Sequence, residues 1–202
     1  MSHSAYVTTV IAGSTSENLS ESALRPYVGD SSIQWLKEGV ACDIFHDATT
    51  PDLSAFAAQH DIITQPVAGR RKQLLISDMD STMIEQECID ELADYLGIKP
   101  HVAAITERAM NGELDFKDAL RERVGLLAGL PEAALEDVYA SRIKLMPGAR
   151  TLVTTMKSHG AYCLLVSGGF TFFTQRIAAA IGFDDNHANQ LEFVDGKLSG
   201  RV

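Results

Sequence analysis

The chain has 202 residues, with 27 acidic and 17 basic side chains and a formal net charge of −10 at pH 7. This length is ample for a hydrophobic core, and 46% hydrophobic with 22% charged residues is typical of a folded globular protein. The composition excludes a disordered or fibrous chain, and the negative charge disfavours nucleic acid and anionic membranes as partners. A small anionic substrate would need cations or a metal ion supplied by its own site.

The cysteines and the first residues indicate the compartment. Cys42, Cys88 and Cys163 have no metal-ligand spacing and are predicted to be buried, reduced thiols. No apolar run approaches the ~20 residues that span a bilayer, and the start lacks the charged and long apolar regions of a signal peptide. We therefore expect a cytoplasmic protein.

Residues 1–70 are expected to form a small α+β amino-terminal domain without a catalytic constellation. The pattern predicts, in chain order, a strand at 6–12, a Ser/Thr/Glu-rich stretch, an apolar patch at 33–36, a strand at 41–45 and a helix starting near Pro51. The basic triplet Arg70, Arg71 and Lys72 that follows is interpreted as a solvated linker.

Residues 73–202 have the pattern of a parallel α/β sheet. The predicted elements are strand, five helices, strand, helix and hairpin, at 73–77, 83–96, 100–110, 115–128, 131–141, 149–159, 162–166, 171–181 and 191–202. A buried strand, a long helical excursion and a second buried strand indicate a sheet that binds ligands at the carboxyl ends of its strands.

Two carboxylates directly follow the first of these strands. Asp78 and Asp80 are two residues apart, so their side chains project to the same side, at the edge where ligands bind. Spacing alone is weak, because about one such pair is expected by chance at this Asp content. Close like charges raise one pKa unless a cation neutralises them, and such oxygen ligands suit Mg²⁺. The position favours phosphate chemistry, with a helix-capping or turn role as the alternative.

The second strand runs into Ser167-Gly168-Gly169. Glycines let backbone amides approach an anion, the hydroxyl adds a donor, and the following helix begins with partial positive charge. The tripeptide therefore predicts a phosphate-binding loop, although many such tripeptides are plain strand-to-helix turns.

Several segments match a known family in order and spacing. They are LLISDMDSTMIEQECIDELADYLG, AMNGELDFKDALRERVGLLAGL, LMPGAR and LLVSGGFTFF. Through them the stretch from about Leu74 to Val202 closely resembles the phosphoserine phosphatases of the haloacid-dehalogenase-type superfamily. The resemblance implies an α/β fold with a Rossmann-like parallel sheet core at 73–202 and an inserted helical cap at about 84–145. For residues 1–70 it implies the variable α+β domain that is ACT-like in some members.

The resemblance also implies roles for residues at the strand ends. Asp78 would be the nucleophile and a Mg²⁺ ligand. Asp80 would be the general acid and base, with its backbone carbonyl also on the metal. Ser167 and Gly168 would bind the phosphoryl oxygens.

In the helical cap, the resemblance implies contacts with the rest of the substrate. Glu87 would meet the ammonium group, Arg123 would meet the carboxylate, and Met110 and Phe116 would close over the substrate. Taken alone, these residues also fit a solvated helix position, a surface ion pair of Arg123 with Glu122 or Asp118, and plain core positions.

The implied function is Mg²⁺-dependent hydrolysis of L-phosphoserine to L-serine and phosphate through an aspartyl phosphate, the last step of serine biosynthesis in this family. Two alternatives stay open: phosphoryl transfer to another alcohol such as homoserine, and a non-catalytic module that binds an amino acid or phosphate. The expected partner is the small-molecule substrate, with no nucleic acid and no membrane, and the sequence is compatible with a homo-oligomer.

One part of the family pattern is missing before Val202. In the family, a lysine and a Gly-Asp-Gly-x-x-Asp segment supply the cation beside the nucleophile and the last metal carboxylate. Neither occurs in this sequence, and Lys197 does not match the family lysine. We therefore expect the sequence to be a fragment of a longer enzyme, inactive by itself and with an open sheet edge.

Overall fold

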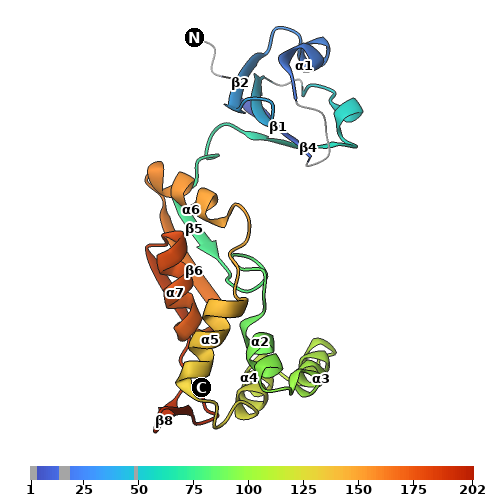
Figure 1. The fold of residues 1–202 in the computed structure, drawn as a ribbon. Coiled ribbons are helices and arrows are strands. Elements are labelled where there is room, and N and C mark those ends of the chain that lie inside the picture. Colours follow the sequence, from blue (N-terminus) through green and yellow to red (C-terminus); the bar gives the residue numbers. More distant parts are fainter. Residues whose placement is uncertain (1–3, 14–18, 48–49) are drawn as a thin grey trace. The chain divides into compact units, whose positions relative to one another are not determined.

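The computed structural model describes residues 4–13, 19–47 and 50–202. The chain divides into two compact units, Met1–Arg71 and Lys72–Val202, and each is described by itself (Figure 1). None of the helices in the described ranges has the length and hydropathy to cross a bilayer.

The first unit is a four-stranded antiparallel sheet with strand order β2-β3-β1-β4. Its elements are β1 (Tyr6–Ala12), α1 (Glu21–Val28), β2 (Ser32–Lys37), β3 (Ala41–His46), a one-turn 3-10 helix (Ser54–Phe56) and β4 (His60–Pro66). The side chain of Ser20 caps α1 by accepting a hydrogen bond from the Ala23 N–H. Buried apolar side chains of the sheet and of α1, among them Val10, Leu24 and Ile44, form the core of this unit.

Two elements of this unit differ from the sequence-based expectation. The helix predicted near Pro51 is wrong, because residues 60–66 pair with β1 as the fourth strand and leave room only for the 3-10 turn before them. Helix α1 was not predicted, since Pro26 lies inside it and polar residues precede it. In the Ser/Thr/Glu-rich stretch, residues 14–18 lie outside the described residues.

Arg70 belongs to the fold of the first unit. Its guanidinium binds both carboxylate oxygens of Asp43, at 2.5 and 2.8 Å, and Thr9 Oγ1 donates to the same carboxylate at 2.7 Å. Asp43 is only 2% exposed, and a buried carboxylate needs such partners to offset the loss of water. The interpretation of Arg70 as a solvated linker residue is therefore wrong.

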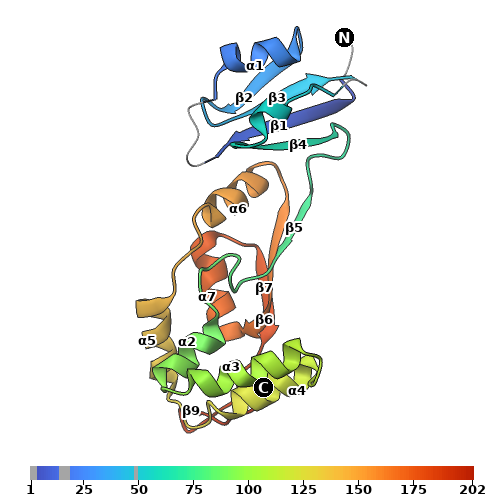
Figure 2. The ribbon, with the colours of Figure 1, turned by 90° about the vertical axis from the view of Figure 1, so that its right-hand side faces the viewer.

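The second unit contains a parallel three-stranded sheet with strand order β5-β6-β7. The strands are β5 (Leu74–Ser77), β6 (Tyr162–Phe170) and β7 (Asp185–Asn189), and the helices α6 (Ala149–Ser158) and α7 (Thr171–Ile181) cover one face (Figure 2). The predicted α/β class with a parallel sheet is confirmed. Strand β7 was not predicted, because the sequence DNHAN is polar and lacks a hydrophobic pattern.

The other face of this sheet has a different character. Large apolar side chains on β5 and β6 are 39–59% exposed there, namely Leu74, Ile76, Tyr162 and Val166. In the part of the chain that the structure describes, no helix covers them (Figure 2).

Four helices inserted between β5 and α6 form a cap, and Figure 2 shows three of them, α2, α3 and α4, beyond the carboxyl end of β6. They are α2 (Cys88–Tyr95), α3 (Lys99–Met110), α4 (Phe116–Gly125) and α5 (Glu132–Arg142). The helix predicted to start at Met83 begins only at Cys88. Residues 83–85 instead lie in the segment that enters the cap and pair with the segment that leaves it. The Met83 carbonyl accepts from the Met146 N–H at 2.9 Å, and the Glu85 N–H donates to the Lys144 carbonyl at 3.0 Å.

A short hairpin of β8 (Phe193–Val194) and β9 (Lys197–Leu198) is attached to the cap. Leu198 exchanges backbone hydrogen bonds of 2.8 Å with Gly129 and Leu130 in the loop between α4 and α5, and its side chain is buried. The cap is therefore held at its two connections and, through the hairpin, at its far end.

Candidate active site

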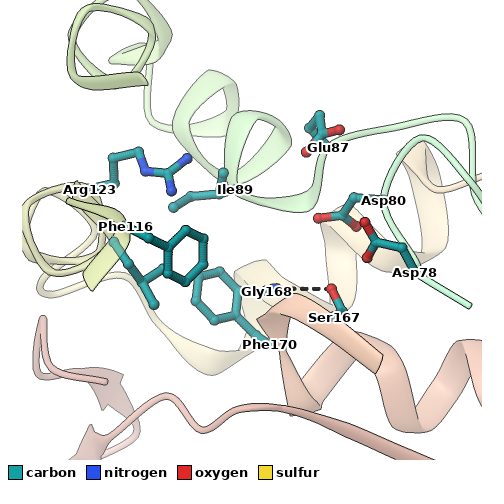
Figure 3. A pocket seen from close by; sticks show the side chains of 11 residues that line it. Asp78, Asp80, Glu87, Ile89, Phe116, Arg123, Ser167, Gly168 and Phe170 are labelled. Atoms are coloured by element: carbon teal, nitrogen blue, oxygen red, sulfur yellow. Dashed lines mark hydrogen bonds between the residues drawn. The ribbon is translucent and has the colours of Figure 1, made fainter. Parts of the chain in front are cut away.

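A cavity of about 210 Å³ lies between the strand ends of the second unit and its cap (Figure 3). The strand ends contribute Asp78, Asp80 and residues 167–170, and the cap contributes Glu87, Ile89, Phe116, Leu120 and Arg123. The structure thus brings together seven of the eight residues singled out from the sequence.

The two aspartates occupy a tight turn at the end of β5. Met79, between them, is fully buried, and its carbonyl accepts the N–H of Met83 at 2.8 Å. Asp78 Oδ1 accepts the Met79 N–H at 2.7 Å. The buried methionine anchors the turn, and both carboxylates line the cavity (Figure 3).

Asp80 is a carboxylate whose hydrogen bonding is incomplete. Its Oδ2 accepts a long hydrogen bond, 3.4 Å, from the Cys88 N–H, and its Oδ1 is buried without a partner among the described residues. Burial raises the pKa of Asp80 from 3.8 to about 6, and the negative charges of Glu87 and Asp78 act in the same direction. A carboxyl group tuned to this range can both donate and accept a proton near neutral pH.

The Ser-Gly-Gly segment forms a bulge in β6. Val166 pairs with His187 and Phe170 pairs with Asn189, so three residues of β6 stand opposite one residue of β7. Within the bulge the Gly169 N–H donates to Ser167 Oγ at 2.9 Å, the contact drawn in Figure 3. The Ser167 oxygen is thereby an acceptor already, which leaves its hydroxyl proton free to donate to an anion.

Close neighbours explain why positions 168 and 169 are both glycine. A Cβ at position 168 would lie 3.0 Å from the Phe116 ring, and a Cβ at 169 would lie 3.1 Å from Ser167 Oγ and 3.3 Å from Asp80 Oδ2. Any side chain here would fill the space between the aspartates, the bulge and the cap. The bulge therefore requires glycine for close approach, as expected for a loop that cradles an anion.

Glu87 is held by a residue that sequence reasoning missed. Ser81 Oγ donates to Glu87 Oε1 at 2.6 Å. Ser81 has φ = 52°, an unfavourable conformation for a residue other than glycine. The only sequence signal for this contact is the position of Ser81 directly after Asp80.

Arg123 makes no ion pair with a described carboxylate. Its guanidinium donates to the Ala119 carbonyl at 3.3 Å and to Thr106 Oγ1 at 3.4 Å, and it lines the cavity. The alternative surface pairs do not form, since Glu122 binds Arg108 and Asp118 binds Arg121.

The two apolar cap residues are placed differently. Phe116, at the start of α4, lines the cavity against the glycine bulge and is 59% exposed. Met110, the last residue of α3, is 83% exposed and is not part of the cavity wall.

The donor set of the site fits a magnesium ion. The described residues contain no group of three or more His, Cys, Asp or Glu side chains arranged for a metal. Mg²⁺, however, commonly takes only one or two protein carboxylates and completes its shell with water and phosphate oxygens. Asp78 supplies one such carboxylate at the cavity wall, and the backbone carbonyl of Asp80 beside it is a second oxygen ligand of this kind, which leaves the Asp80 carboxyl group for proton transfer.

With this geometry established, comparison with known proteins gives the family. The family model of the haloacid dehalogenase-like hydrolases matches residues 75–202. The chain belongs to this family.

Named relatives of this hydrolase chain are phosphoserine phosphatases. The chain is 53% identical over 131 residues to the phosphoserine phosphatase of Polaromonas sp., a match that covers 64% of this chain and 56% of the relative. A solved substrate-bound phosphoserine phosphatase complex superposes with a TM-score of 0.61 at 38% identity, over 66% of this chain and 63% of the other.

A third match extends over the first unit as well. A haloacid dehalogenase family hydrolase from Salmonella enterica serovar Typhi superposes with a TM-score of 0.77 at 26% identity, over 96% of this chain and 71% of the other. The chain spans about half the length of the curated relatives it matches.

Proposed function

We propose that the protein carrying this chain is a Mg²⁺-dependent phosphatase that hydrolyses L-phosphoserine to L-serine and phosphate. The observation that carries the proposal is that Asp80, partly buried and with one buried oxygen lacking a described partner, lies beside Asp78 and across from the glycine bulge. The named relatives support phosphoserine as the substrate.

Asp78 is the nucleophile of the proposed reaction. It is exposed to the cavity, where a phosphate seated on the bulge would meet its free carboxylate oxygen. Attack of that oxygen on phosphorus breaks the bond between phosphorus and the serine oxygen and leaves an aspartyl phosphate.

Asp80 moves the protons. Because its pKa is raised to about 6, part of the population is protonated near neutral pH, and the carboxyl group donates its proton to the departing serine oxygen. The carboxylate that results accepts a proton from water, which then hydrolyses the aspartyl phosphate.

The Ser167 hydroxyl and the Gly168 N–H bind the phosphoryl oxygens. Mg²⁺, held by the Asp78 carboxylate and the Asp80 backbone carbonyl, would supply positive charge opposite the transferring group. These charges and donors stabilise the charge that develops in the transition state, the largest contribution expected in phosphoryl transfer.

The cap binds the carboxylate and the ammonium group of the substrate. Arg123 has no carboxylate partner among the described residues and faces the cavity, so its guanidinium is available to the substrate carboxylate. Glu87, fixed by Ser81, offers a carboxylate to the substrate ammonium. Phe116 bounds the cavity between them and the bulge.

The test is replacement of the nucleophile in the complete gene product. Asp78→Asn should abolish release of phosphate from phosphoserine and should leave the far-UV spectrum and melting temperature close to wild type. Asp118→Asn, an exposed carboxylate of α4 outside the cavity, is the matched control and should retain turnover.

A rapid quench with phosphoserine provides the second readout. Wild type should gain one phosphoryl group on the peptide that contains Asp78, detected by mass spectrometry. With homoserine added, free phosphate and not phosphohomoserine should be the product. Unchanged turnover in Asp78→Asn would exclude the nucleophile assignment.

A further inference from the structure

Asn189 lies behind the glycine bulge, on the last position of β7. Its side-chain Nδ2 donates to the carbonyl oxygen of Gly168 at 2.8 Å and to that of Gly169 at 3.3 Å. Asn189 is not among the residues that line the cavity, so it acts on the site through the backbone of the bulge. These are contacts to the backbone of the segment that forms the wall.

The bulge explains why these carbonyls need a side-chain partner. Three residues of β6 oppose one residue of β7, so the regular ladder is interrupted at the bulge. The Asn189 amide supplies the hydrogens that the missing ladder contacts would otherwise provide.

Holding the Gly168 carbonyl also fixes the opposite edge of the same peptide. The C=O and the following N–H of a trans peptide point in opposite directions, and the described chain has no cis peptide bond. With the Gly168 oxygen turned to Asn189, the Gly169 N–H is turned to Ser167 Oγ, which it meets at 2.9 Å. The contact behind the bulge thus determines a contact on its cavity side.

The local sequence cannot hold this peptide by itself. Glycine adopts positive and negative φ with similar ease, so a Gly-Gly peptide is free to flip unless outside contacts prevent it. A flip would point the Gly168 carbonyl into the cavity, beside Asp80 and Asp78, where it would repel a phosphate.

We propose that Asn189 is the positioning residue of the phosphoryl-binding loop, fixing the Gly168–Gly169 peptide so that the Gly169 N–H holds Ser167 Oγ and the Ser167 hydroxyl presents its proton to the phosphate. This inference rests on the proposed function of the cavity. Its consequence is measurable without turnover, because it concerns the affinity for inorganic phosphate.

The experiment compares two positions on β7. Asn189→Asp keeps the shape of the side chain and removes the donors. Asn186→Asp adds the same charge three residues earlier on the strand and keeps an oxygen to accept the Thr174 hydroxyl, now bound at 2.8 Å. Asn189→Ala removes the side chain without adding charge. Phosphate affinity is measured by titration calorimetry on the complete gene product with Mg²⁺.

Loss of the hydrogen bonds to the two bulge carbonyls should weaken phosphate binding about tenfold in Asn189→Ala and at least as much in Asn189→Asp. Asn186→Asp should bind within about twofold of wild type. KM for phosphoserine should rise with the phosphate dissociation constant, and the Gly169 amide resonance should move in ¹⁵N-glycine spectra of both Asn189 variants.

A role in packing alone predicts a different pattern. Asn189→Asp, with the original shape, would then bind phosphate like Asn186→Asp, and this result would overturn the inference. If an Asn189 variant does not fold, the wild-type side-chain amide protons of Asn189 serve instead. They should shift on phosphate addition, and their failure to shift contradicts the inference. No phosphate binding by wild type would instead contradict the proposed function.

Discussion

Each unit shields a carboxylate from water, fully for Asp43 and partly for Asp80, and the hydrogen bonding of the two carboxylates is opposite. Asp43 in the first unit is 2% exposed and is bound by Thr9 and by both arms of Arg70. Asp80 in the second unit has one long hydrogen bond and one buried oxygen without a described partner. Residue type and burial alone therefore do not separate a structural acid from a reactive one, whereas partners do.

One arginine in each unit shows the same difference. Arg70 forms an ion pair with Asp43, whereas Arg123 lines the cavity with only a carbonyl and a hydroxyl as partners. A satisfied charge stabilises a fold, and an unsatisfied charge in a cavity is available to a ligand. The contrast predicts opposite effects for equivalent substitutions in the two units.

Of the substitutions that test this comparison, Asp80→Asn is expected to have the largest effect. Asp80→Asn removes the proton donor and acceptor and should lower turnover of phosphoserine by roughly 10²–10⁴, the usual contribution of general acid–base catalysis. The melting temperature should not fall. Steady-state assays of the complete gene product, with phosphate release as the signal, measure the first quantity. Turnover of Asp80→Asn within fivefold of wild type would mean that Asp80 is not a reactive acid, and its contrast with Asp43 would fail.

The equivalent change in the first unit should lower stability instead of turnover. Asp43→Asn removes the charge that Arg70 faces and should destabilise the first unit by on the order of 2–4 kcal/mol, less than for a fully buried pair because Arg70 reaches solvent. Hydrogen exchange of the amides of β1 and β3 reports on this unit alone. Exchange unchanged from wild type would show that the Asp43 pair does not stabilise the sheet.

Arg123 tests the unpaired charge in the cap. Arg123→Ala should lower kcat/KM for phosphoserine about ten- to a hundredfold, since a charge-assisted contact contributes roughly 1.5–3 kcal/mol. Hydrolysis of an aryl phosphate, which has no carboxylate, should change little. Arg121→Ala, whose side chain pairs with Asp118 outside the cavity, is the control. Equal losses on both substrates would mean that Arg123 supports the cap and does not read a carboxylate.

The pH dependence of stability sharpens the comparison for Asp80. Its pKa is about 6 in the folded protein and 3.8 ordinarily, so the protonated form favours folding. This stabilisation is complete below pH 4 and is lost as the pH rises through 6. Asn at this position stays neutral, so metal-free Asp80→Asn should exceed wild type by roughly 1–3 kcal/mol at pH 8.

Denaturant unfolding in EDTA measures that difference. It should stay nearly constant from pH 8 down to the folded pKa of about 6, shrink as the pH falls from there, and vanish below pH 4, where wild-type Asp80 is itself neutral. A constant difference at all pH values would mean that Asp80 is not the group whose charge is unfavourable.

Sequence reasoning found the parts of this molecule that depend on local pattern. The strand before Asp78, the strand before Ser167 and helix α7 have strong apolar patterns. The resemblance of the surrounding segments supplied three cap residues of the cavity wall, Glu87, Phe116 and Arg123, but not Ile89 and Leu120. Strand β7 and helix α1 were missed because a polar edge strand and a helix containing Pro26 have no such pattern.

The supporting contacts could not be predicted for a related reason. Arg70 meets Asp43 across 27 positions, and Asn189 meets the bulge across about 20. Such pairings are set by strand order and register, which a single sequence does not specify. Asn189 and Ser81 therefore become visible only once the sheet and the cap are assembled.

The smallest effect is expected at Ser81, which holds Glu87 in place. Ser81→Ala leaves a side chain at this positive φ, as in wild type, and removes the 2.6 Å hydrogen bond to Glu87. The Glu87 carboxylate then becomes more mobile but keeps its charge. We expect a rise of about fivefold in KM for phosphoserine, with kcat nearly unchanged. Ser81→Thr retains the hydroxyl and should restore most of the affinity.

Ser81→Gly separates an effect on the fold from an effect on Glu87. Because glycine suits φ = 52° better, Ser81→Gly should raise the melting temperature while weakening substrate binding as Ser81→Ala does. A KM that follows the melting temperature across the three variants would mean that Ser81 acts on the fold and not on Glu87.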